Sequence, residues 1–233
     1  PGLVTQVELL YGYIRFKVQP PQIKDGNNWV NNPLYREGNA VIAAYDSQRK
    51  VLWSWHIWVT DEPKVVAFGP EEDAITLLDR NLGATASYAP TGVKASIDTS
   101  GLLLATYGLY YQWGRKDPSM GPEVANYLPQ STETASYYDY YGMKWDYAGV
   151  VTKDRPGIRD GVENPMYLVL PTDFSMTTYQ YDWMYTNVDN LWGDYLEKTI
   201  YDPCPFDYMV PQDEISTIFA STSHTHENER GMY

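Results

Sequence analysis

One segment of the chain combines aromatic rings with planar hydrogen-bonding groups, a combination that suits the binding of sugars. Residues 110–117 read Tyr-Tyr-Gln-Trp-Gly-Arg-Lys-Asp. A ring covers the apolar C–H face of a sugar, while Gln, Arg and Asp side chains bond to its hydroxyl groups. The same side chains could instead anchor the loop through bonds to the backbone, and the sequence leaves both interpretations open. The ligand-binding interpretation predicts contacts from Tyr110, Gln112, Trp113, Arg115 and Asp117.

A histidine lies in the middle of a tryptophan-rich segment. Residues 51–60 read Val-Leu-Trp-Ser-Trp-His-Ile-Trp-Val-Thr, and their alternation predicts a strand that is covered on both faces. A buried polar group needs hydrogen-bond partners, and the sequence identifies no nucleophile or acid that would pair with His56 in catalysis. We therefore interpret His56 as a hydrogen-bonded structural histidine.

Two groups of residues carry side chains that metal ions use as ligands. His224 and His226 lie in a polar tail and lack the i, i+4 helical spacing of a zinc protease motif. A set of oxygen-bearing side chains near Trp192 matches no calcium-loop spacing. That set is Asp182, Asp189, Asn190 and Asp194. We predict neither a metal site nor a cofactor.

The chain contains a single cysteine, Cys204, so it has no internal disulfide and no cysteine-based metal site. Free cysteine is among the most buried residue types, which predicts a buried position for this one. The sequence contains no nucleophile elbow, phosphate-cradling glycine loop, metalloprotease motif or dinucleotide-binding fingerprint. We therefore predict no catalytic residues and expect that the protein is not an enzyme.

Composition narrows the classes of partner. The 233 residues carry a formal net charge of −13 and include 22 tyrosines and 8 tryptophans but only 5 phenylalanines. The negative charge argues against binding to nucleic acid or to an anionic membrane surface, both of which need clustered Lys and Arg. Tyrosine and tryptophan suit half-wet surfaces and interfaces. Sugars and other proteins are the expected partners, and no apolar run is long enough to span a bilayer.

Residues 1–62 are expected to form a small antiparallel β unit. Residues 3–18 alternate as a single strand does, and residues 19–39 carry loop chemistry, with three prolines and two Asn-Asn pairs. An apolar run at 41–45 and the tryptophan-rich strand are separated by a plausible turn, Asp-Ser-Gln-Arg-Lys at 46–50. These two segments predict a β-hairpin.

Residues 63–233 are expected to form a second, loop-rich domain. Short strands are predicted at 74–78 and 166–170, and a helix is predicted in the first half of 102–113. With the β unit before it, the predicted fold class is mixed α+β and rich in β-structure.

Three parts of the second domain lack a clear strand or helix pattern. Residues 61–70 carry two prolines and an acidic start, which is typical of a connector. Residues 114–165 show no sustained period, and an excursion of that length is a functional loop or an insertion. A proline at 211 followed by acidic residues predicts a helix start, and the polar tail from 221 is expected to be mobile.

Four signature segments occur in a fixed order along the chain. They are Gly-Asn-Ala-Val-Ile-Ala at 38–43, Asp-Arg-Asn-Leu-Gly-Ala at 79–84, Tyr-Gly-Leu-Tyr-Tyr-Gln-Trp-Gly-Arg-Lys-Asp-Pro at 107–118 and Tyr-Asp-Pro-Cys-Pro at 201–205. The order of the last three segments resembles the Fibrobacter succinogenes major paralogous (FISUMP) domain. With the tryptophan-rich strand it resembles more closely the C-terminal region of fimbrillin-like (Mfa-like) surface proteins of Bacteroidales. The resemblance runs from about residue 36 to 215.

The resemblance implies a secreted protein of the bacterial cell surface, associated with the outer membrane or with fimbriae. It implies a fold akin to C-type-lectin-like and formylglycine-generating-enzyme-like domains, in which aromatic-lined loops are held on a small sheet. The implied partners are glycans, host or bacterial surface proteins and other fimbrial subunits. The resemblance carries no catalytic residues.

The chain departs from the family pattern near its end. After Cys204-Pro205 the family continues Gly-Trp-Arg-Val-Pro, whereas residues 206–211 read Phe-Asp-Tyr-Met-Val-Pro, and Ile215 replaces a family tryptophan. The chain also stops soon after Phe219, where a lectin-like domain continues with further strands. The domain is therefore expected to be incomplete at its C-terminus, and this leaves a lectin-type calcium site in doubt.

Two functions remain open from the sequence. The first is an adhesin or tip subunit that binds a glycan or protein through residues 107–117 and neighbouring loops. The second is a structural fibre subunit in which residues 3–18 pair with the open sheet edge of a neighbour. An oxidase of the formylglycine type is disfavoured, because a single cysteine cannot supply a cysteine pair.

Overall fold

The computed structural model describes part of the chain. The described residues are 3–18, 22–25, 28–31, 37–68, 75–87, 104–106, 108–119, 137–138, 144–145, 149–172, 183–186, 188–194 and 197–211. Several expectations fall outside these residues: the helix after Pro211, the tail from 221, the pair His224 and His226, and Asp182.

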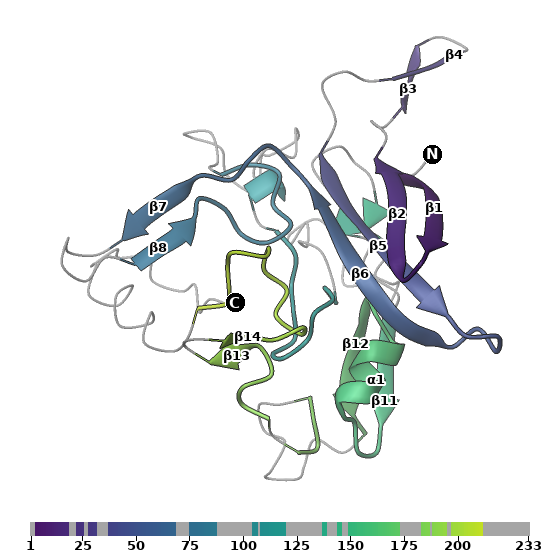
Figure 1. The fold of residues 1–233 in the computed structure, drawn as a ribbon, viewed down its shortest axis with the longest axis vertical. Coiled ribbons are helices and arrows are strands. Elements are labelled where there is room, and N and C mark those ends of the chain that lie inside the picture. Colours follow the sequence, from purple (N-terminus) through teal and green to yellow (C-terminus); the bar gives the residue numbers. More distant parts are fainter. Residues whose placement is uncertain are drawn as a thin grey trace, which may run out of the picture.

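The described part of the chain is rich in β-structure, and its strands pair two by two (Figure 1). The small antiparallel sheets agree with the predicted fold class. The antiparallel pairs are β1 (Val4–Leu10) with β2 (Tyr13–Val18), β3 (Gln22–Asp25) with β4 (Asn28–Asn31), β5 (Gly38–Tyr45) with β6 (Val51–Val59), β7 (Val65–Phe68) with β8 (Ile75–Leu78), β9 (Tyr137–Tyr138) with β10 (Lys144–Trp145), and β13 (Gly193–Asp194) with β14 (Glu197–Lys198).

The hairpin of β5 and β6 confirms the prediction made for residues 41–60. Its register pairs Val41 with His56 and Ile42 with Trp55. Asp46 closes the turn, because its Oδ1 atom accepts hydrogen bonds from the backbone N–H groups of Gln48 and Lys50, both at 2.8 Å. All residues of β6 except Leu52 are buried or half-buried, so this strand is covered on both faces as expected.

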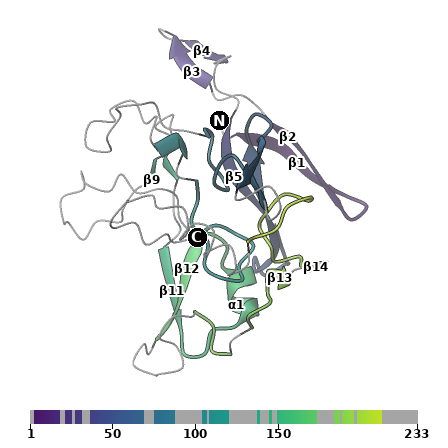
Figure 2. The same cartoon turned by 90° about the vertical axis from the view of Figure 1, so that its left-hand side faces the viewer.

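The prediction of one strand over residues 3–18 is wrong, because the segment folds back on itself as the β1–β2 hairpin. Tyr11 and Gly12, the two turn residues, have φ values of 49° and 86°. Positive φ at both central residues gives a turn whose twist matches that of the flanking strands. Residues 19–39, which were expected to be loop, contain β3, β4 and the start of β5. The β3–β4 hairpin projects from the rest of the chain in both views (Figures 1 and 2).

A parallel strand pair is linked by an α-helix that contacts β6. β11 (Gly149–Lys153) runs parallel to β12 (Tyr167–Pro171), and α1 (Ile158–Glu163) lies in the connection and contacts β6. A parallel pair needs a crossover connection of this kind, because a tight turn between two strands leaves them antiparallel. β12 confirms the predicted strand at 166–170 to within one residue. The 114–165 excursion, which shows no sustained period in the sequence, contains β9, β10, β11 and α1 among its described residues.

Two further expectations are corrected by the structure. The connector at 61–70 contains β7, which pairs with β8, the strand predicted at 74–78. In the region where a helix was predicted, the described residues form only the short 3₁₀ helix η2 (Leu104–Thr106). Within the described residues no helix is long and apolar enough to cross a membrane.

The main apolar cluster lies where the parallel pair meets the last part of the chain. Its buried members are Val169, Trp183, Met184 and Leu191, with Ile158, Val188 and Tyr201 packed around them. Buried and part-buried hydrogen bonds also join β6 to residues beyond 63. Ser54 bonds to Asp117 and Trp58 bonds to Ala84, so contacts cross the expected boundary between residues 62 and 63.

Candidate ligand-binding site

Arg115 holds the parallel strand pair and α1 together from a buried position. The residue is 3% exposed. Its Nη1 atom donates to the carbonyl oxygen of Tyr167 at 2.5 Å and to Gln112 Oε1 at 2.7 Å. Its Nη2 atom donates to the carbonyl oxygens of Gly161 at 3.2 Å and Asn164 at 2.7 Å, at the C-terminal end of α1. A cation is favoured there because it meets the unpaired carbonyls of the last helical turn. Burial lowers the pKa of Arg115 to about 10, so the guanidinium stays charged at neutral pH.

Gln112 binds to β12 as a neighbouring strand would. Its Nε2 atom donates to the carbonyl oxygen of Val169 at 2.8 Å, and its Oε1 atom accepts from the N–H of Val169 at 2.9 Å. The amide therefore satisfies both backbone groups of a fully buried strand residue.

Asp117 lies in a buried polar cluster with β6. Its Oδ2 atom accepts from Lys116 Nζ at 2.5 Å and from Ser54 Oγ at 2.8 Å, and Lys116 also donates to the Ser54 carbonyl at 2.8 Å. The ammonium lies 4.5 Å from the centre of the Trp53 ring, and burial lowers the pKa of Lys116. A serine beside a lysine has the composition of a nucleophile and its base. Ser54 is 1% exposed, however, so this hydroxyl group is closed to a substrate.

Trp113 is the exposed member of the predicted set. Its side chain is 37% exposed, and its ring packs on Trp192 with centroids 4.5 Å apart. Its backbone is fixed, because Trp183 Nε1 donates to the Trp113 carbonyl at 2.6 Å and Trp192 Nε1 donates to the carbonyl of Arg115 at 3.0 Å. The loop is thus anchored while part of the Trp113 side chain stays exposed.

His56 is a structural histidine, as the sequence predicts. Its Nε2 atom lies 2.9 Å from Asn39 Oδ1, and its Nδ1 atom lies 2.9 Å from the Tyr111 hydroxyl. Because Asn39 Nδ2 donates to the carbonyl of Gly83, Asn39 Oδ1 accepts, which places the His56 proton on Nε2 and makes Tyr111 the donor to Nδ1. Burial lowers the pKa of His56 to about 4, against the opposing charge of Asp117.

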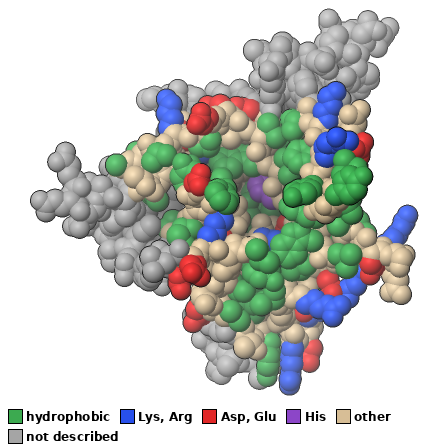
Figure 3. Space-filling view, viewed as in Figure 1, with side chains coloured by type: hydrophobic (Ala, Val, Ile, Leu, Met, Phe, Trp, Pro, Cys, Tyr) green, Lys and Arg blue, Asp and Glu red, His purple; other side chains and the backbone are tan. Residues whose placement is uncertain are grey.

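A cavity of about 370 Å³ opens beside this anchored loop. Figure 3 shows apolar side chains gathered around a hollow on this face of the molecule. Three of the four signature segments contribute to its wall, and Tyr110 is the predicted site residue that lines it. The lining residues are Thr76, Leu77, Leu78, Arg80, Asn81, Leu82, Leu109, Tyr110, Tyr111, Trp192, Pro203, Cys204, Tyr208, Met209, Val210 and Pro211.

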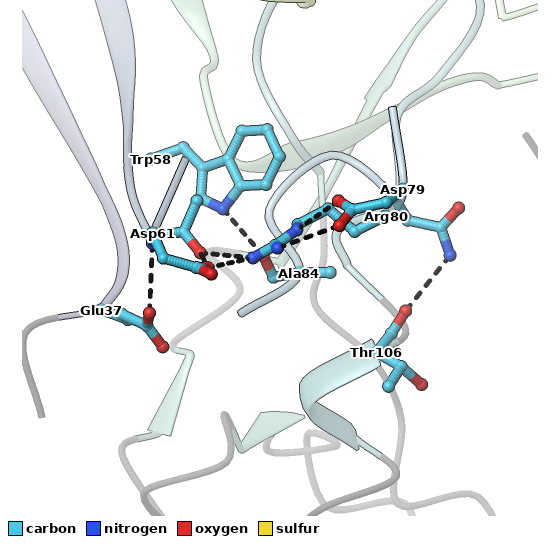
Figure 4. A network of polar contacts seen from close by, with 9 residues as sticks. Glu37, Trp58, Asp61, Asp79, Arg80, Ala84 and Thr106 are labelled. Carbon is cyan, nitrogen blue, oxygen red and sulfur yellow. Dashed lines mark hydrogen bonds and ion pairs between the residues drawn. The ribbon is translucent and has the colours of Figure 1, made fainter. Parts of the chain in front are cut away.

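One wall of the cavity is held by the Arg80 ion pairs (Figure 4). Arg80 Nε donates to Asp79 Oδ1 at 2.8 Å, and Nη1 donates to Asp61 Oδ1 and to Thr60 Oγ1, the latter at 2.9 Å. The Arg80 side chain is only 3% exposed. Its hydrogen bonds lower the pKa of both carboxyl groups and raise the pKa of Arg80. The guanidinium charge is therefore balanced before any ligand arrives.

The opposite wall is held by Lys198 and Asp202. Lys198 Nζ donates to Asp202 Oδ1 at 3.0 Å and to the carbonyls of Cys204 at 2.5 Å and Tyr208 at 2.6 Å. The Asp202 carboxylate accepts from the backbone N–H groups of Cys204 at 2.7 Å and Val210 at 2.8 Å. Cys204 is half-buried rather than fully buried, and burial raises the pKa of its thiol to about 12.

The five predicted residues lie close together in the structure, but their side chains make different contacts. Gln112, Arg115 and Asp117 bond to the protein itself, as the anchor interpretation proposes. Tyr110 lines the cavity and Trp113 is exposed, so for these two a ligand contact stays a prediction. Sequence reasoning missed the walls formed by β8, Trp192 and residues 208–211, because no local pattern shows that these distant segments meet.

The described residues contain no group of three His, Cys, Asp or Glu side chains that could hold a metal ion. Asp189, Asn190 and Asp194 are all exposed. Comparison with protein-family models, with curated proteins and with solved structures finds no significant match to this chain.

Replacing Arg115 with Met should destabilise the fold strongly, because three backbone carbonyls lose a charged donor in a buried place. Each hydrogen bond to a charged group contributes about 1.5–3 kcal/mol, so we expect a loss of at least about 3 kcal/mol in the free energy of unfolding. Urea denaturation followed by tryptophan fluorescence measures it. Arg159→Met is the matched control, since Arg159 pairs with Glu163 on the surface and should tolerate the change. Equal losses in both variants would contradict the anchoring role.

Stability should fall as the pH is lowered from about 6.5 to 4, because the unfolded chain protonates His56 at its ordinary pKa of 6.5 whereas the folded chain keeps it neutral down to about 4. The shift corresponds to a loss of about 3 kcal/mol at the lower end of this window. Urea midpoints measured across the window test this. His56→Gln keeps a donor and an acceptor but does not titrate, so its curve should be flatter there; an unchanged slope would show that other groups cause the loss.

Proposed function

We propose that this chain is a non-enzymatic bacterial cell-surface or fimbria-associated protein, an adhesin or tip subunit that binds a glycan or protein in the cavity. The supporting observation is the convergence of three signature segments, distant in the sequence, on one cavity of about 370 Å³. That volume lies in the range of about 300–1,000 Å³ that is usual for ligand pockets, which are mostly apolar with a few polar groups.

The bonds that fix the loops around the cavity support a binding role. Its loops are fixed by buried bonds from Arg115, Arg80 and Lys198, and a pre-organised wall loses little conformational entropy when a ligand arrives. The titratable groups of the buried clusters are committed to one another, as in Lys116 with Asp117. We propose an extracellular location on the resemblance of the signature segments alone.

Replacing Tyr110 with Ala should weaken ligand binding by about tenfold or more without loss of the fold, since Tyr110 lines the cavity and an aromatic contact contributes about 0.5–1.5 kcal/mol beyond its buried area. Binding to a glycan array and to a panel of matrix and surface proteins measures this, with circular dichroism to verify folding. Tyr45→Ala serves as the control, because Tyr45 is equally aromatic, 60% exposed and absent from the cavity wall. Failure of the unaltered protein to bind any glycan or protein would count against the proposal.

A structural fibre subunit is the second candidate, and the β1–β2 hairpin favours it. Leu9, Tyr11 and Tyr13 are 70%, 98% and 77% exposed, and no further described strand pairs with either outer edge of this hairpin. Exposed apolar strand edges are templates for pairing with another chain.

Deleting residues 1–18 should then abolish assembly and leave a soluble monomer, because the pairing edge is removed while the buried anchors remain. Sedimentation velocity and electron microscopy follow the fibres. The double variant Leu9→Ser and Tyr13→Ser should slow assembly, whereas Tyr45→Ser should not. Fibres of normal length from the deleted protein would exclude this role for the hairpin.

A further inference from the structure

The cavity meets β8 at the edge of the strand rather than at one of its faces. Thr76, Leu77 and Leu78 are consecutive, and all three line the cavity. Successive side chains of a strand point to opposite faces, so a cavity on one face would be lined by alternate residues only. Contact with three residues in a row places the cavity alongside the backbone.

In the register of the β7–β8 hairpin, the backbone N–H and C=O groups of two β8 residues point towards the cavity. The N–H of Asp79 donates to the carbonyl of Lys64 at 2.8 Å, and Val65 is opposite Leu78. Residues of an antiparallel pair alternate between facing the partner and facing away from it. The N–H and C=O groups of Thr76 and Leu78 therefore point away from β7. Among the described residues no other strand pairs with this edge of β8.

Three of the polar side chains that line the cavity already bond within the protein; Thr76, Asn81, Tyr110 and Tyr208 also carry hydroxyl or amide groups in an otherwise mostly apolar lining. Arg80 donates to two carboxylates, the Tyr111 hydroxyl donates to His56 and Trp192 Nε1 donates to a backbone carbonyl. A hydroxyl group transferred from water to a site without a partner is destabilised by about 1–3 kcal/mol. Because Arg80 pairs with two carboxylates, the cavity also provides no net positive charge for an anionic ligand.

We propose that the cavity binds an extended, uncharged and apolar segment of a partner protein, which adds as a third strand beside β8. Backbone groups of the segment pair with Thr76 and Leu78, and its apolar side chains enter the space between Leu82, Leu109 and Val210. In this mode main-chain hydrogen bonds supply affinity and side-chain pockets supply specificity. The inference rests on the proposed function in that it takes the cavity as the ligand site.

The charge of the chain restricts the partner further. With a formal net charge of −13, the protein repels acidic segments and attracts segments flanked by Lys or Arg. The expected ligand therefore has an apolar centre, no Asp or Glu, and basic residues on at least one side.

A phage-displayed library of random heptapeptides flanked by lysine tests the inference. We expect selection on the unaltered protein to enrich sequences with apolar residues at alternate positions and without Asp or Glu. The most enriched heptapeptide, synthesised with blocked ends, should bind and should slow alkylation of Cys204 by N-ethylmaleimide, because Cys204 lines the cavity.

Two proline variants of the same hairpin separate pairing at β8 from other modes of binding. Thr76→Pro removes an N–H that faces the cavity, and it should reduce peptide affinity by about tenfold or more because a hydrogen bond is lost and the proline ring blocks the edge. Ala67 is opposite Thr76, so Ala67→Pro removes an N–H on the far edge of β7 and should leave affinity unchanged. Both residues are exposed, and both variants keep the bonds between β7 and β8.

The outcomes distinguish this inference from the proposed function. A selection without enrichment, or equal binding to both proline variants, overturns strand addition at β8. If a glycan binds instead and Tyr110→Ala abolishes its binding, the cavity remains the ligand site and only the peptide assignment fails. If neither glycan, protein nor peptide binds, both proposals fail.

Discussion

The burial of one guanidinium group is the constraint on which the described structure depends. Arg115 donates to carbonyls on β12, on α1 and just after α1, so this one side chain links the parallel pair to its crossover helix. A buried charge is tolerated because it meets four oxygen atoms at once. The same loop carries Gln112, which completes the bonding of Val169, and Asp117, which joins β6. One short segment therefore connects three parts of the fold.

Anchoring of that loop determines which of its residues can meet a ligand. Once the side chains of Arg115 and Asp117 turn inward, the preceding residues Leu109–Tyr111 form the cavity wall. The backbone conformation just before Leu109 requires a glycine at position 108. The φ of Gly108 is +72°, and an added Cβ atom would lie 2.5 Å from the carbonyl oxygen of Leu82. Tyr111 is held in addition through His56 and Asn39. The wall is thus positioned by residues that do not themselves face the cavity.

Local patterns in the sequence predict those elements whose signal is local. The β5–β6 hairpin and β12 are predicted from alternation and apolar runs, and His56 is identified as structural because no catalytic partner accompanies it. The β1–β2 turn is missed because tyrosine is an uncommon residue at positive φ, where Asn or Gly is the usual signal. The hydrogen-bond partner of Gln112 cannot be predicted from the adjacent sequence. A planar amide can bond equally well to a sugar or to a backbone, and its partner Val169 lies 57 residues away.

Two sides of the cavity differ in the groups that they offer to a ligand: one is mainly apolar, and the other presents backbone hydrogen-bonding groups. On one side Lys198 and Asp202 fix the loop of residues 203–210 through bonds that are already complete, so this side contributes shape and apolar contact. On the other side β8 presents backbone groups directed away from its partner strand. A ligand that supplies only apolar surface leaves those groups unpaired, and a ligand that supplies only hydroxyl groups fits the apolar wall poorly. An extended apolar peptide would satisfy both walls at once, which is why we propose a protein segment rather than a sugar as the ligand.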